Sequence, residues 1–498
     1  MRRMGREYEM TLSLNIPESQ SREQRLGSIT GYHGTFKKLT QQGCAGCLGN
    51  LKRCFTTVSS CSHTHAVNQL AGIKDAVVVD HAPVGCSAGM INFSINRNRV
   101  NFNASGEKRH LIVVSSNMKE SDTIFGGTEK LKKTIRAAYR RHKPKAIYVS
   151  TSCTSSIIGD DINSVVQEMS EELNIPVGYA AGEGIKSKIW ASGFDAYCHA
   201  VANTIIKPPK EKKNTINYIA FTQINRERMD AYIEKLGLKV IYITGKSSIE
   251  DYEKASQSIA SFGQCGAQSS YLAGALEQMF GIKYFQSHLP FGGIGFERFY
   301  RDIAKFLGKE EIAEQVINED REKYKEELDY IRGKLAGKTA FVALGASYAF
   351  EYTRILRELG VKVLRTVAYH YDPKLDNQSD DLVAAATDAE EFNHDMEVSV
   401  NDAQQFETYL LVKNNRPDFI ISRAHGASVW GVKMGIPAIE AKISLEVFGY
   451  AGLVSFGKII VNELSNNNFV KKLGRRYESP FTDKFEQSEP YSYLEEVK

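Results

Sequence analysis

Short, continuously apolar segments alternate with amphipathic segments along most of the chain. The apolar segments are rich in Val and Ile and lack polar alternation, which is typical of strands in a parallel sheet buried on both faces. The predicted strands are 76–80, 111–115, 146–150, 218–222, 240–244, 340–344, 361–364 and 418–422. The predicted helices between them are 130–141, 162–173, 269–280 and 350–359. This alternation predicts an α/β protein built from doubly wound units.

Two stretches with linker-like composition divide the chain. Residues 207–214 read KPPKEKKN, and residues 333–338 read GKLAGK. We therefore expect an N-terminal arm over 1–40 that packs on a partner or stays loose, followed by α/β domains over 41–210, 211–335 and 336–498. The sequence has no GxxxxGK[ST] loop, and no GxGxxG follows a predicted strand. We do not expect the chain itself to bind ATP or a dinucleotide in the usual way.

The overall charge gives no reason to expect a nucleic-acid or membrane partner. Over 498 residues, 63 basic and 59 acidic side chains leave a net charge of +4. No segment approaches the ~20 apolar residues that a membrane helix needs. The basic N-terminus MRRMGREYEM has no apolar core behind it, so it does not resemble a signal peptide. We expect a cytoplasmic protein.

Eight cysteines lie within the first 265 residues, which in a reducing compartment indicates metal or redox chemistry. Cys86 and Cys153 each follow a predicted strand, and Cys61 precedes the element that leads into the first of these strands. Separations of 25 and 67 residues do not fit a zinc pattern, whereas thiolates from three loops suit an iron–sulfur cluster. Three ligands leave the cluster incomplete, so a second chain would have to close it.

The remaining cysteines fit this pattern less well. Cys44 and Cys47 form a CAGC motif, with Cys54 seven residues further on. The motif is consistent with a surface metal or redox site, or with an alternative to Cys61. Cys198 lies in the helical stretch AYCHAV, and we expect it in the core.

Four segments carry a resemblance to a known family. They are DHAPVGC at 80–86, STSCTSSIIGDDI at 150–162, FGQCGAQSSYLAGALEQMFGI at 262–282 and VKMGIP at 432–437. In this order they resemble segments of the α-type subunits of nitrogenase and its relatives. The resemblance extends, with gaps, from about Cys61 to about residue 465. The resemblance implies three Rossmann-like domains with parallel sheets, and metal clusters at strand ends and domain interfaces.

The resemblance also implies cofactors and partners. Cys61, Cys86 and Cys153 match the cysteines that hold half of an Fe8S7 P-cluster, and a β-type subunit in an α2β2 assembly supplies the other half. Cys265 matches the cysteine that binds a large carbide-type Fe8S9C cluster, for which a heterometal stays open; the alternative is a buried cysteine at a helix start. Electrons would come from an ATP-hydrolysing homodimeric iron protein with a 4Fe–4S cluster.

The sequence departs from nitrogenase where the large cluster would bind. Phe448 stands where nitrogenase has its histidine ligand. Trp190 and Phe194 stand where it has a Gln and a His. Ser347 and Ala349 stand where nitrogenase has arginines that hold an organic acid. Neither side chain can form the paired, charge-assisted hydrogen bonds that a guanidinium gives to a carboxylate.

These departures predict a small, aromatic pocket that suits a neutral thioether. Among nitrogenase-like reductases the chain is most similar to the catalytic subunits of methylthio-alkane reductases, which cleave C–S bonds of small methylated sulfides. One alternative is a cofactor-maturation scaffold of the nitrogenase assembly type, and a less favoured one is a divergent nitrogenase α subunit. No histidine follows His425. His425 is therefore our candidate for the second ligand of the large cluster or for a proton donor.

Overall fold

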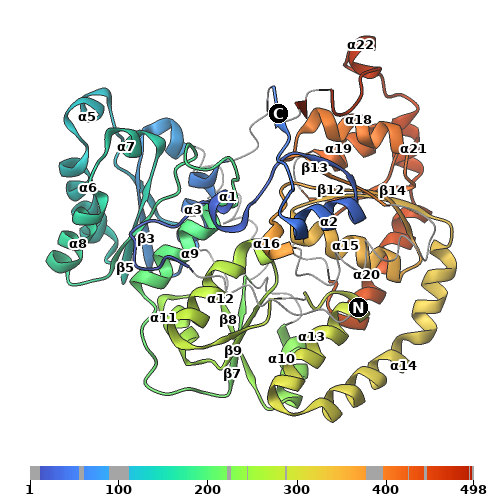
Figure 1. Ribbon diagram of the computed structural model, residues 1–498, viewed down its shortest axis with the longest axis horizontal. Helices are drawn as coiled ribbons and strands as arrows, with labels where there is room; N and C mark the ends of the chain where they lie inside the picture. The colour runs from blue at the N-terminus through green and yellow to red at the C-terminus, as the bar shows by residue number, and fades with distance from the viewer. Residues whose placement is uncertain are drawn as a thin grey trace.

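The computed structural model contains three predominantly parallel sheets, each flanked by helices, arranged around a common centre (Figure 1). It describes residues 12–54, 56, 61–88, 111–220, 226–243, 245–286, 289–376, 396–423, 426–441, 446–492 and 494–495. The predicted α/β class with parallel sheets is confirmed. Within these ranges, no helix combines the length with the apolar character that a membrane crossing demands.

The first sheet has the strand order β4-β3-β5-β6. Its strands are β3 (Ala76–His81), β4 (Val113–Ser115), β5 (Ala146–Thr151) and β6 (Val177–Ala180). The helices around it are α3 (Ser62–Leu70), α5 (Glu120–Phe125), α6 (Thr128–His142), α7 (Cys153–Ile158), α8 (Ile162–Leu173) and α9 (Ser192–Thr204). Successive strand residues face opposite sides, so Val77 and Val79 pack with α6 and α8, whereas Val78 packs with α3 and α9.

The second sheet has the order β10-β9-β7-β8. Its elements are β7 (Thr215–Ile219), α10 (Arg226–Lys235), β8 (Lys239–Ile243), α11 (Ile249–Lys254), η1 (Ala255–Gln257), β9 (Ala260–Gly263), α12 (Gly266–Phe280), β10 (Lys283–Tyr284), α13 (Gly292–Leu307) and α14 (Glu310–Leu335). Strand β7 begins and ends three residues before the predicted 218–222. The strand ends because Ala220 has a φ of +60°. The polar Asn217 is tolerated within the buried strand because its side-chain amide donates to the Ala255 carbonyl at 2.9 Å.

The third sheet has six strands in the order β1-β13-β12-β11-β14-β15. Its strands are β1 (Tyr32–Thr35), β11 (Thr339–Leu344), β12 (Lys362–Ala368), β13 (Glu397–Val400), β14 (Phe419–Ser422) and β15 (Ala438–Glu440). The helices of this part are α2 (Phe36–Ala45), α15 (Ala346–Glu358), α16 (Pro373–Asp376), α18 (Gln405–Asn415), α19 (Ala427–Lys433), α20 (Gly449–Ser465), α21 (Asn468–Gly474) and α22 (Asp483–Glu486). Strands β2 (Lys52–Arg53) and β16 (Leu494–Glu495) form a separate pair. The predicted linkers lie between α9 and β7 and around the start of β11, and the domain bounds stay predictions.

Residues 12–40 are not the arm that we predicted. Helix α1 (Arg22–Leu26) is buried against the body of the chain, and β1 joins the edge of the third sheet antiparallel to β13. Phe36 and Leu39 belong to the core. The prediction failed because the Ser and Gln residues of this segment looked loose, whereas Ser21 and Gln24 form a capping box that starts α1.

Each sheet reverses its direction of growth once. In the first sheet the chain adds β4 on one side of β3 and β5 on the other; the second reverses between β7 and β9, and the third between β11 and β14. Crevices for ligands form beyond the carboxyl ends of strands at such reversals. The fold therefore offers three neighbouring sites for chemistry, one for each sheet.

A buried arginine joins the three parts of the chain. The Arg22 guanidinium donates to Asp195 of α9 and to Asp372 before α16, both at 2.9 Å, and also to the Ala267 carbonyl of α12. Arg25 adds a second ion pair to Asp195 at 2.7 Å. Arg22, Asp195 and Asp372 are almost completely excluded from water, so loss of one partner would leave a charge uncompensated.

We expect Arg22→Ala to lower the free energy of unfolding by about 3–5 kcal/mol, because it leaves the Asp372 carboxylate buried without its cation. Arg136→Ala is the control, since Arg136 forms an ion pair of similar geometry with Glu172 on the exposed surface. Its loss should be below about 1 kcal/mol. Urea unfolding followed by circular dichroism measures both values, and equal losses would contradict the role assigned to Arg22.

A second prediction concerns Asp402, in the turn after β13. Burial raises the pKa of Asp402 to about 6, although Arg53 and His370 lower it, and Glu407 adds to the rise. The unfolded chain releases this proton at a lower pH, so the carboxyl destabilises the fold progressively between about pH 4 and pH 6. Asp402→Asn should therefore be more stable than the natural chain at pH 7 by about 1–2 kcal/mol in urea unfolding, and by only about a third of that at pH 4.5. A difference independent of pH would show that this titration is not its cause.

Candidate metal centres

Three cysteines lie beside the reversal point of the first sheet. Cys61 is the residue before α3, Cys86 lies in the helical turn after β3, and Cys153 is the first residue of α7 after β5. Cys61 and Cys153 are half-buried and Cys86 is exposed. All three are free thiols. The strands that precede Cys86 and Cys153 are paired with each other in parallel, which brings their carboxyl ends together.

One buried carboxylate ties two of these loops together. Asp80, at the end of β3, contacts His63 Nε2 through one oxygen at 2.7 Å and accepts a hydrogen bond from Ser87 through the other at 2.6 Å. His63 lies two residues after Cys61, and Ser87 follows Cys86. The positions of both cysteines therefore depend on a single side chain.

The third loop is held by backbone groups. Ser152, the N-cap of α7, donates to the carbonyl of His81 at 3.1 Å. Ser62 donates to the carbonyl of Gly182 at 2.6 Å. A Cβ atom on Gly184 would lie 3.3 Å from Cys61 Cβ and 3.9 Å from Cys153 Sγ. A larger side chain at Gly184 would therefore crowd both Cys61 and Cys153.

The electrostatics favour a thiolate at Cys61. Burial raises the pKa of this thiol, but hydrogen bonds from His63 and Thr64 outweigh burial and lower the pKa to about 7. Burial lowers the pKa of His63, whereas its contacts with Asp80 and Cys61 raise it to about 10. For Cys86, burial and the negative charges of Asp80, Cys153 and Cys61 raise the pKa. The thiols therefore interact electrostatically and need a shared positive charge to ionise together.

This donor set fits an iron–sulfur cluster better than a single ion. Within the described ranges, no group of three or more His, Cys, Asp or Glu side chains is arranged to hold one metal ion. Soft sulfur donors from three loops suit a cluster, in which several irons share the ligands. Cys61, Cys86 and Cys153 are the residues that would hold it.

Cys265 occupies the reversal point of the second sheet. It follows β9 as the N-cap of the 15-residue helix α12, and its side chain is buried. Burial raises the pKa of this thiol, and backbone hydrogen bonds together with the charges of Arg423 and Arg22 oppose the rise. A long helix that starts at Cys265 also favours negative charge there. A single buried thiol with cations nearby fits the attachment of one iron of a larger cluster.

The predicted aromatic residues lie together in one cluster. The rings of Trp190 and Phe194 are 5.9 Å apart, and the His65 ring lies 4.5 Å from Trp190 and 5.2 Å from Phe194. The His370 ring meets Trp190 edge-on at 5.6 Å. His65 and His370 were missed in the sequence analysis, although His65 stands four residues after Cys61, which was a usable signal.

The third sheet contributes residues at its own reversal point. Ser347, which follows β11, lies against the turn at Gly266, where a Cβ atom would be 2.9 Å from its hydroxyl. Ala349 is buried in the core. Arg423, which follows β14, places its guanidinium 5.9 Å from the centre of the Tyr348 ring. A positive charge is thus supplied by Arg423, directly after β14, and not by the segment around Ser347 and Ala349, where nitrogenase has its arginines.

Other predicted positions have different surroundings. Phe448, the N-cap of α20, packs against Tyr232 and Phe296 in the core. His425 and the side chain of Cys44 lie outside the described residues. Cys47 and Cys54 are exposed, and Cys198 is buried in α9 as expected.

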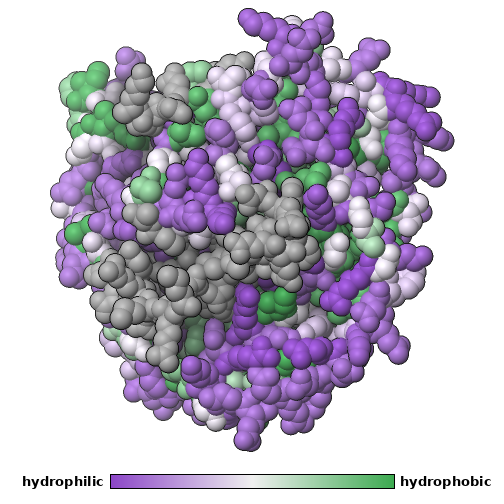
Figure 2. Space-filling model, turned by 45° about the vertical axis from the view of Figure 1, so that its right-hand side comes forward, coloured by the Kyte–Doolittle hydropathy of each residue, from purple (hydrophilic) through white to green (hydrophobic). Residues whose placement is uncertain are grey.

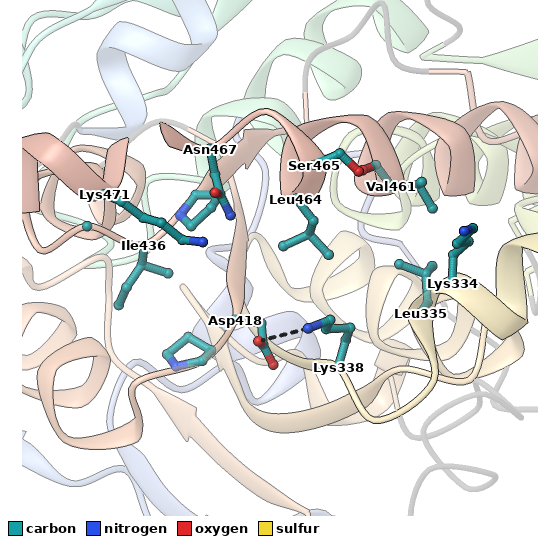
Figure 3. A pocket seen from close by; sticks show the side chains of 13 residues that line it. Lys334, Leu335, Lys338, Asp418, Ile436, Val461, Leu464, Ser465, Asn467 and Lys471 are labelled. Atoms are coloured by element: carbon teal, nitrogen blue, oxygen red, sulfur yellow. Dashed lines mark hydrogen bonds and ion pairs between the residues drawn. The ribbon is translucent and has the colours of Figure 1, made fainter. Parts of the chain in front are cut away.

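A surface pocket of about 410 Å³ lies at the opposite end of the third sheet (Figure 3). It is lined by residues that precede β11, β14 and β15, among them Lys338 and Asp418, which form an ion pair at 3.6 Å. Sites in open α/β sheets form at the carboxyl ends of strands. This pocket lies at the amino ends, so we assign it no part in the chemistry.

The chain is similar to known proteins over most of its length. The family model of the nitrogenase component 1 type oxidoreductases matches residues 61–465. The nitrogenase iron-molybdenum cofactor biosynthesis protein NifE of Methanococcus maripaludis is 28% identical over 415 residues, 81% of this chain and 82% of that protein. The nitrogenase molybdenum-iron protein alpha chain of Clostridium pasteurianum is 33% identical over 317 residues, 62% of this chain and 59% of that protein. The structure of nitrogenase Cp1 at pH 5 has a TM-score of 0.67 and 25% identity, and covers 87% of this chain and 94% of that one.

We expect Gly184→Val to abolish most iron binding at the first site, because its branched side chain would enter the space between Cys61 and Cys153. Gly333→Val is the matched control, since nothing lies within 4 Å of a Cβ atom at Gly333 in α14. Iron per chain after anaerobic reconstitution measures the effect, with circular dichroism as the check on folding. A Gly184→Val protein that loads as much iron as the control would disprove the assigned space.

Proposed function

Because the chain belongs to the nitrogenase component 1 type oxidoreductase family, we propose that it is the α-type catalytic subunit of a nitrogenase-like reductase that cleaves C–S bonds of small methylated sulfides. The observation that carries the proposal is the placement of its thiols at reversal points of two sheets. Cys61, Cys86 and Cys153 would hold half of a P-cluster, and Cys265 would bind a large iron–sulfur cluster. Each set fits the group proposed for it, as argued above.

The surface around the three cysteines supports a partner chain that completes the P-cluster. Val84, Ile157 and Ile185 are all exposed, and each lies within four residues of Cys86, Cys153 or Gly184. Ile124 and Phe125 of α5 add to this apolar area, and α5 packs on α7. Figure 2 shows apolar atoms gathered at the upper left, the region where Figure 1 places α5 and α7. Such a patch on a mostly polar surface is typical of a protein interface.

The partner in this proposal is a β-type subunit, in an α2β2 assembly in the cytoplasm. The electron donor is an ATP-hydrolysing homodimeric iron protein with a 4Fe–4S cluster. The chain has no ATP loop of its own, so the hydrolysis that drives electron transfer needs this second protein. Electrons would then pass to the shared P-cluster and on to the cluster at Cys265.

The aromatic cluster of Trp190 and Phe194 supports a weakly polar substrate. Trp190 and Phe194 offer aromatic faces to methyl groups and exclude water. The reaction adds two electrons from the iron protein and two protons to a methyl sulfide. One C–S bond breaks, and one C–H and one S–H bond form, which gives a hydrocarbon and methanethiol. When bound, the large cluster would supply the electrons. His65, whose ring lies 4.5 Å from Trp190 at an interplanar angle of 34°, is the side chain suited to deliver a proton.

A second candidate is a scaffold for cofactor maturation. The observation that favours it is the match to a NifE protein over 82% of that protein, together with Phe448 in place of a histidine ligand. A scaffold must release its cluster, so weaker attachment would serve it. A divergent nitrogenase is the less favoured alternative, because Trp190 and Phe194 replace the polar pair expected beside its substrate.

The test is turnover by the anaerobically purified α–β complex with its iron protein, ATP and dimethyl sulfide. We expect methanethiol and methane in equal amounts. Cys153→Ala should lose iron and at least about tenfold of the turnover, because electrons no longer reach the second cluster. Cys198→Ala is the control for the loss of a cysteine, since its buried thiol donates to the Gln268 carbonyl at 3.7 Å and belongs to neither proposed ligand set. A complex that holds both clusters, reduces no sulfide and activates a cofactor-free nitrogenase would support the scaffold instead.

A further inference from the structure

His370 is a buried histidine whose ring makes no hydrogen bond in the described structure. The residue is 1% exposed, and both ring nitrogens are without a hydrogen-bond partner. Nε2 has only a longer contact, 3.4 Å, with Oδ2 of Asp372. By contrast, both ring nitrogens of the buried His81 and His199 are hydrogen-bonded. Buried polar groups are nearly always paired, so the buried and unpartnered ring nitrogen of His370 calls for a ligand.

The position of His370 links it to Cys265. It follows β12, the strand beside β11 at the reversal point of the third sheet. Two residues further on, Asp372 shares the Arg22 guanidinium with the Ala267 carbonyl, which belongs to the first turn of the helix that Cys265 caps. The two turns also touch directly, since a Cβ atom on Gly266 would lie 3.3 Å from Leu375.

The aromatic cluster provides a second link. The His370 ring meets Trp190, which also contacts His65 and Phe194. These are the walls that we assign to the substrate pocket. His370 therefore lies between the residues assigned to that pocket and the turn that carries Cys265. No described residue forms a hydrogen bond with its Nδ1 atom.

We propose that His370, through Nδ1, is the imidazole ligand of the large iron–sulfur cluster, in the role that Phe448 cannot fill. The inference rests on the proposed function, since it needs the second cluster to exist. Neutral imidazole binds iron through one nitrogen while the other nitrogen keeps its proton. Asp372 faces that second nitrogen, and carboxylates commonly orient metal-binding histidines in this way. Arg22 in turn fixes Asp372, so the ligand would be held from behind by the ion pairs that join the three sheets.

The test compares His370→Phe with His199→Phe, two buried histidines changed in the same way. In the metal-free chain, His370→Phe should leave stability unchanged or raise it, because it removes an unpaired polar group. His199→Phe should lower stability, because it breaks hydrogen bonds to Tyr271 and to the Ile16 carbonyl. These results are expected from urea unfolding whether or not a cluster is ever loaded.

In the anaerobically purified complex, His370→Phe should lose the electron-paramagnetic resonance signal of the large cluster and about half of the iron, whereas His199→Phe keeps both. His370→Cys should regain the iron with a shifted signal, because a thiolate can replace the imidazole. Full iron and an unchanged spectrum in His370→Phe would overturn the assignment, and His370→Gln serves as the non-ligating variant should the Phe variant fold poorly. If the natural complex and Cys265→Ala hold equal iron and show the same spectrum, no second cluster exists, and the proposed function fails before His370 is tested.

Discussion

The arrangement of the three sheets depends on one buried cation. Arg22 comes from the first described helix, yet its guanidinium binds groups of α9, α12 and the turn before α16, one in each part of the chain. Burying an arginine costs several kcal/mol unless its charge and its hydrogen bonds are matched. Two carboxylates and a carbonyl provide that match only when the three parts lie in their native positions. The ion pairs therefore contribute less to overall stability than to specifying a single relative position of the sheets.

That position decides where chemistry is possible. Each sheet alone offers one reversal point, and each such point holds a residue of interest: Cys86 and Cys153 in the first sheet, Cys265 in the second and Arg423 in the third. A large cluster needs ligands and charge from more than one direction, which a single doubly wound unit does not offer. The residues around Cys265 come from all three units. The chain thus uses a repeated architecture to bring all three units to the start of one helix, since the Cys198 thiol donates to the Gln268 carbonyl of α12 and Ser347 lies against Gly266.

Much of this was accessible from the sequence. The runs of Val and Ile identified the strands before Cys86 and Cys153, because buried parallel strands need continuously apolar segments. β9 was missed, since ASFG contains one large apolar residue and depends on its neighbours for burial. The role of residues 12–40 was also missed, because ion pairs across more than 100 residues leave no local pattern. Asp80, Gly184 and His370 were overlooked because their surroundings come from loops that only the fold brings together. Asp80 gave a signal as a carboxylate at the end of an apolar run, whereas nothing around His370 in the sequence indicates that its ring is unpaired.

The edge strand β1 has a consequence for how the chain is made. Its partner β13 is encoded roughly 360 residues later, so at about 5–20 residues per second the ribosome needs on the order of half a minute to deliver it. During that interval the first two sheets can form, while Arg22 has no Asp372 to bind and β1 has no β13 to pair with. Contacts that span the whole sequence close last, because the loop entropy must be overcome first. The nascent protein therefore passes through a stage in which the loops of Cys61, Cys86 and Cys153 can form, while the third-sheet residues that pack beside Cys265, Ser347 and Leu375 among them, are not yet in place.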